Sequence, residues 1–66
     1  MNEQAVKELA AKARRGVYER IPIEALQEKL RPFYRGQELP TQNMFRSEQE
    51  YRKALIKELI GKEFGL

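Results

Sequence analysis

The 66-residue sequence contains no cysteine, no histidine, no aspartate and no tryptophan. Without cysteine the chain has no disulfide to brace a small fold and no thiolate to bind a metal. Without histidine and aspartate as well, it lacks the ligand sets of zinc sites and of iron sites built from two histidines and a carboxylate. We therefore expect neither a metal centre nor a cofactor.

Groups that drive catalysis are also scarce. Apart from the tyrosines, the only hydroxyl side chains are Thr41 and Ser47, and Ser47 is better explained as a helix cap. No glycine-rich loop has the spacing of a phosphate-binding loop, and each glutamate stands in a helical, charge-paired or surface context. We predict that the protein is not an enzyme and takes no small-molecule substrate.

Long hydrophobic runs are missing too. No apolar stretch approaches the roughly 20 residues that a membrane span needs, and the first residues lack the apolar segment of a signal peptide. We expect a cytoplasmic protein of bacterial or phage type that does not act at a membrane. The absence of cysteine agrees with a reducing compartment.

What the sequence does contain is helical patterning. Apolar residues at three- and four-residue spacing predict one small all-α domain with three helices, over about residues 3–16, 22–31 and 48–60. Residues 32–46, which contain two prolines and a glycine, are predicted to form an irregular loop. A chain of this length holds one domain at most.

Local signals mark the ends of these helices. Asn2 is a suitable N-cap, and Ser47 with Glu50 forms the capping box that opens the third helix. Pro32 is expected to stop or kink the second helix near residue 31, because proline disfavours the α conformation of the preceding residue. Gly61 is expected to end the third helix as its C-terminal glycine.

The expected core follows from the same spacing. Its members are Val6, Leu9, Ala10, Ala13 and Val17 in the first helix, Ile23, Leu26 and Leu30 in the second, and Tyr51, Ala54, Leu55 and Leu59 in the third. Gly16 either ends the first helix or lies within it at a close approach, which places that boundary between Arg15 and Arg20.

The third helix carries more apolar surface than a single core contact needs. Ile56 and Ile60 form a second ridge beside its main apolar face, so that apolar residues cover more than half of the circumference. Two interpretations follow. Either this helix is central and the other two helices pack on separate faces, or a partner chain buries the ridge. Phe64 and Leu66 could also cover it.

The loop raises a related question, because Phe33 and Tyr34 stand side by side between two arginines. Aromatic residues, methionine and arginine are typical of protein interfaces. We expect Phe33 to pack inward and Tyr34 to be presented to a partner. The predicted partner-binding residues are Arg31, Tyr34, Arg35, Met44 and Arg46 of the loop, with Ile56 and Ile60 of the ridge.

Nucleic-acid binding is the alternative. Residues 12–46 hold eight basic residues and four glutamates, so this segment has a net charge of +4. Arginines could contact phosphates while an aromatic ring stacks on a base. The residues predicted for this alternative are Lys12, Arg14, Arg15, Tyr18, Arg20, Arg31 and Arg35.

Two resemblances point to binding proteins. The segments RIPIEALQEKL and SEQEYRKALIKEL, with their Arg52, Ala54 and Leu55, resemble the ribbon-helix-helix family of dimeric DNA-binding repressors. That resemblance implies a strand before Pro22 whose outward residues, Tyr18 and Arg20, read bases. More faintly, the segments GVYERIP, EAL and EKLRPFY resemble the theta accessory subunit of bacterial replicative polymerase.

We therefore expect a small regulatory or adaptor protein that binds a protein partner or forms a homodimer. The alternative is a dimeric DNA-binding regulator of the ribbon-helix-helix kind that uses residues 12–46.

Overall fold

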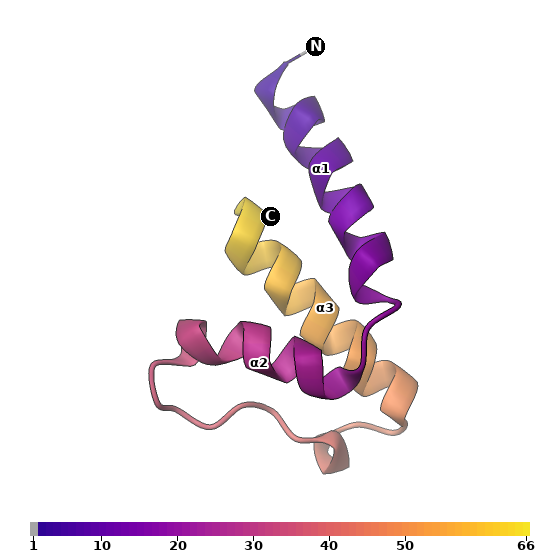
Figure 1. Cartoon of the computed structure of the whole chain (residues 1–66), viewed down its shortest axis with the longest axis vertical. Coiled ribbons are helices and arrows are strands. Elements are labelled where there is room, and N and C mark those ends of the chain that lie inside the picture. Colours follow the sequence, from indigo (N-terminus) through magenta and orange to yellow (C-terminus); the bar gives the residue numbers. More distant parts are fainter. Residues whose placement is uncertain (1) are drawn as a thin grey trace.

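The computed structural model describes residues 2–66, and this part of the chain is all-α, as predicted. Helix α1 spans Glu3–Tyr18, α2 spans Ile23–Tyr34 and α3 spans Glu48–Phe64, with a single 3-10 turn, η1, at Gln42–Met44. Helices α1 and α2 both pack on α3 and make little contact with each other. Figure 1 shows α2 crossing α3, while the N-terminal half of α1 projects beyond the other helices.

Two predicted N-caps are confirmed. The Asn2 Oδ1 accepts a hydrogen bond from the Ala5 backbone N–H at 2.7 Å, and the Ser47 Oγ accepts one from the Glu50 backbone N–H at 3.2 Å. Each bond satisfies a backbone donor that the first turn of a helix leaves without a partner. These starts depend on residues within one turn of the cap, which is why the sequence alone predicts them.

Two predicted helix ends are wrong. Helix α2 continues through Pro32 to Tyr34, and α3 continues through Gly61 to Phe64. In both cases the extra turn carries an aromatic residue that packs against the core, namely Tyr34 in α2 and Phe64 in α3. This tertiary contact outweighs the local preference of the proline or glycine.

The residues that do end these helices have left-handed backbone conformations. Gly65 follows α3 at φ 70°, and Arg35 follows α2 at φ 50°. Gly16, whose role the sequence left open, lies inside α1, which ends at Tyr18 within the predicted interval.

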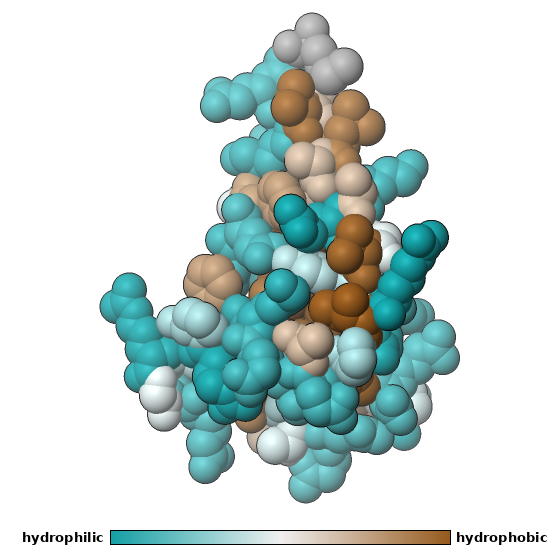
Figure 2. Space-filling model, viewed as in Figure 1, coloured by the Kyte–Doolittle hydropathy of each residue, from teal (hydrophilic) through white to brown (hydrophobic). Residues whose placement is uncertain are grey.

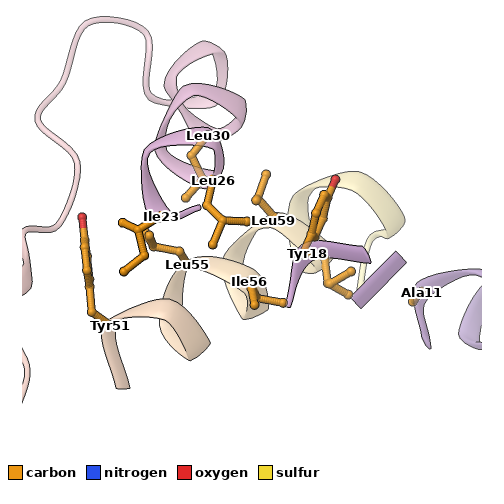
Figure 3. Close-up of a cluster of buried hydrophobic side chains, with 10 residues drawn as sticks. Ala11, Tyr18, Ile23, Leu26, Leu30, Tyr51, Leu55, Ile56 and Leu59 are labelled. Carbon is orange, nitrogen blue, oxygen red and sulfur yellow. The ribbon is translucent and has the colours of Figure 1, made fainter. Parts of the chain in front are cut away.

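Helix α3 is the centre of the fold. Its Tyr51, Leu55 and Leu59 are buried with the predicted α2 residues Ile23, Leu26 and Leu30, and Figure 3 shows these side chains converging between the two helices. Ile56 and Ile60 are also buried, with exposed fractions of 4% and 2%. Their assignment to a partner-facing ridge is therefore wrong, because the chain itself buries them.

Helix α1 packs with a different side from the one predicted. Its buried residues are Ala11 and Tyr18, which lie two turns apart on one face. The predicted core residues Val6, Leu9 and Val17 are instead 53%, 57% and 50% exposed, and Ala10 and Ala13 are exposed as well. These five residues lie about 130° around the helix from Ala11 and Tyr18. We call them the α1 stripe.

Candidate interaction surface

The orientation of α1 depends on Tyr18. Its ring is 1% exposed, and its hydroxyl donates a hydrogen bond to Glu63 of α3. Burial and that hydrogen bond raise the pKa of Tyr18 to about 12. The Arg14 guanidinium and the Lys29 ammonium each lie 6.0 Å from the centre of the ring. One large buried ring with a satisfied hydroxyl therefore fixes which side of α1 meets α3.

This arrangement contradicts the resemblance to ribbon-helix-helix proteins. In the described part of the chain no strand is present, and Tyr18 ends a helix. Its buried side chain cannot read a base. Arg20 is exposed, and Arg52 donates a hydrogen bond to the Ile21 carbonyl.

The remaining basic residues predicted for nucleic-acid binding form two separate groups. Lys12, Arg14 and Arg15 lie on α1, whereas Arg31 and Arg35 lie at the far end of α2 (Figure 1). Arg15 shares a shallow groove between α1 and α3 with Lys53 and Lys57. This groove also contains the acidic Glu19, so its positive charge is partly compensated.

The predicted roles of Phe33 and Tyr34 are reversed. Tyr34 packs against the core, and its hydroxyl donates to the Glu58 carboxylate, with an Oη–Oε2 distance of 2.7 Å. That hydrogen bond, together with burial, raises the pKa of Tyr34 to about 12. Phe33, which has no polar group to bond, is 43% exposed.

The residues predicted to form a binding surface on the loop lie at two separate places. Arg31 and Arg35 lie at the end of α2, and Met44 and Arg46 lie in or beside η1, at the other end of the loop (Figure 1). Arg31 forms a salt bridge with Glu28, from Nη2 to Oε1 at 3.2 Å. Met44 is 70% exposed. Although these side chains are accessible, the fold does not bring them together as one surface.

The α1 stripe is the largest alignment of exposed apolar residues along one helix. Among residues 2–66, six large hydrophobic residues are exposed, and three of them belong to this stripe. Figure 2 shows apolar side chains following α1 where this helix projects from the molecule. The sequence did single out these residues, but it assigned them to the core, because periodicity identifies an apolar face without showing what covers it.

Tyr51 shows how the loop is held to the core. Its hydroxyl donates a hydrogen bond to the Pro40 carbonyl at 2.6 Å and accepts one from the Gln27 side-chain amide at 2.9 Å. Its ring lies 5.4 Å from that of Phe45, centre to centre. The loop is thus held to the core on its inner side, at Pro40 and Phe45.

Within residues 2–66, no three acidic side chains gather into a group that could hold a metal ion. None of the helices in this range combines the length and the apolar character that a membrane crossing requires.

No protein-family model matches the sequence, and no curated protein or solved structure shows significant similarity to the chain. The function therefore has to be inferred from the residues of the chain itself.

Proposed function

We propose that this protein acts without catalysis, as a small regulatory or adaptor protein that binds another polypeptide through the α1 stripe. One observation supports the proposal. Val6, Leu9 and Val17 are half exposed or more, although they lie on one side of a regular helix with Ala10 and Ala13 between them. Single exposed apolar residues are ordinary on a protein surface. An aligned set of them marks an interaction site.

The stripe has the dimensions of a helix-binding face. Val6 and Val17 are 11 residues apart, which corresponds to about 16 Å along the helix axis. Complete burial of the three large side chains would stabilise a complex by roughly 1 kcal/mol each, since about half of each is already covered. Such a face is suited to reversible binding.

The loop is secondary in this proposal. Arg31 and Arg35 are separated from Met44 and Arg46, and Tyr34 is hydrogen-bonded to Glu58. Arg31 and Arg35 can add contacts at the edge of a complex. The buried Ile56 and Ile60 take no part in it.

Site-specific photo-crosslinking tests the proposal. A photoreactive amino acid replaces Leu9 in one variant and Met44 in a matched control, since both side chains are exposed and apolar. In cells that make the protein, we expect a covalent adduct with a polypeptide from position 9 and little from position 44. The additional change Val17→Gln should remove the adduct. Adducts with lipid or nucleic acid alone, or none from position 9, would contradict the proposal.

A further inference from the structure

We infer that the polypeptide bound by the α1 stripe is a second copy of this chain, with the two α1 helices paired in antiparallel orientation. This inference rests on the proposed function, because it identifies the partner of the same surface. Three features support it: the order of side chains along the stripe, the charge distribution of α1 and the surface area that α1 can bury.

The side chains of the stripe are arranged so that an antiparallel copy fits. Large residues stand at both ends, Val6 and Leu9 at one and Val17 at the other, and Ala10 and Ala13 lie between them. When a second α1 is reversed, Val6 lies opposite Val17 of that copy and Ala10 lies opposite Ala13. Leu9 then lies opposite Arg14, whose aliphatic stem can pack on it. The small alanines allow the two helix axes to approach to about 8 Å at the crossing point.

The charges of α1 select the antiparallel orientation. Of the six charged residues of α1, Glu8 and Arg15 lie on the side opposite the stripe, whereas Glu3 in the N-terminal half and Arg14 in the C-terminal half lie within about 90° of its centre. Among the described residues the only salt bridge joins Glu28 and Arg31, so no charge of α1 is paired in this way. An antiparallel pair turns Glu3 of each helix towards the C-terminal half of the other, which carries Arg14, and sets the two helix dipoles in opposite directions. A parallel pair would place the two Arg14 side chains on the same side of the pair.

The area predicts a weak dimer. Helix α1 has 16 residues, and a contact about 24 Å long and 10 Å wide covers only a few hundred Å² on each copy. Stable interfaces bury about 1,200–2,000 Å² in total. The complex should therefore form in the concentration range of about 10 μM to 1 mM and dissociate on dilution.

Sedimentation equilibrium tests self-association directly. At low salt, the average mass should rise from 7.8 kDa towards twice that value as the concentration increases from about 10 μM to 1 mM. Leu9→Gln should weaken the dimer by about tenfold or more without loss of helical circular dichroism, whereas Met44→Gln should not change it. A mass of 7.8 kDa at the highest concentration, or a dimer insensitive to Leu9→Gln, would overturn the inference.

Single cysteines test the orientation, because the natural chain has none. In a mixture of Val6→Cys and Val17→Cys copies that carry different tags, oxidation should favour the disulfide between the two variants. Predominant coupling of identical variants would mean a parallel pair and would refute the antiparallel arrangement.

The outcomes separate this inference from the proposed function. If the chain stays monomeric but position 9 forms an adduct with another protein, the self-association is wrong and the proposed function holds. If the monomer instead binds vesicles that contain anionic lipid through position 9, both are wrong.

Discussion

Replacing Ile60 by alanine is a strong test of the fold, because the sequence allowed two opposite roles for this residue. Ile60 is 2% exposed and lies on the side of α3 that the chain covers itself. Truncation of a buried isoleucine to alanine costs about 2–5 kcal/mol, through lost apolar burial and the cavity left behind. A core in a chain of this size supplies only about 3–5 kcal/mol. We therefore expect Ile60→Ala to lose about 40% or more of the free energy of unfolding.

Two further variants calibrate that result. Ile60→Val removes a single methylene group and should cost about 0.5–1.5 kcal/mol. Leu9→Ala removes as much volume as Ile60→Ala, but from a residue that is 57% exposed. Since alanine also favours the helix, Leu9→Ala should change the free energy of unfolding by no more than about 0.5 kcal/mol. The ratio between the Ile60 and Leu9 variants measures the difference between a core position and a surface position of similar hydrophobicity.

Urea unfolding followed by far-ultraviolet circular dichroism gives the required free energies. The concentration should be low enough that the chain is monomeric, since self-association would add stability by mass action. Equal losses for Ile60→Ala and Leu9→Ala would refute the central position of α3. Loss of self-association with unchanged stability in Ile60→Ala would mean that the ridge faces a partner after all.

Four other changes test local features. Because the pKa of Tyr18 is raised to about 12, the folded chain keeps a proton that the unfolded chain loses between about pH 10 and 12. The stability from this group should therefore be complete below pH 10 and fall as the pH rises to 12. Tyr18→Phe should lack this part of the pH dependence in alkaline unfolding curves. Ser47→Ala should lower the free energy of unfolding by about 1 kcal/mol in urea titrations, and Ser47→Asp should restore most of it. Arg35→Gly should raise the thermal midpoint, because an arginine at φ 50° carries about 1 kcal/mol of strain that glycine avoids. Gly65→Ala should lower that midpoint, because it places a side chain on a residue whose φ of 70° suits glycine.

The sequence predicted the features that depend on neighbouring residues. The three helices and the caps at Asn2 and Ser47 follow from spacing and from hydrogen bonds within one turn. The helix ends predicted at Pro32 and Gly61 were wrong, because packing of the following turn against the core determines where each helix ends. No pattern within one helix contains that information.

The sequence could not predict which apolar residues face inward. Leu9 was predicted to lie in the core and Ile56 to face a partner, yet Leu9 is exposed and Ile56 is buried. The difference depends on Tyr18, whose hydroxyl bonds to Glu63, a residue 45 positions away in the sequence. Tyr34 is drawn inward by Glu58 in the same manner, 24 positions away. Long-range hydrogen bonds of tyrosine thus determine the orientation of two helices.

The dependence of α1 and α2 on α3 has a consequence for synthesis on the ribosome. Of the three helices, α1 and α2 are made before α3 and scarcely touch each other, although α3 supports both. A nascent chain that has reached only η1 has nothing on which to bury Tyr18 or Leu26. Folding must therefore wait until α3 has emerged, and until then the unfinished chain offers its apolar residues to chaperones and proteases.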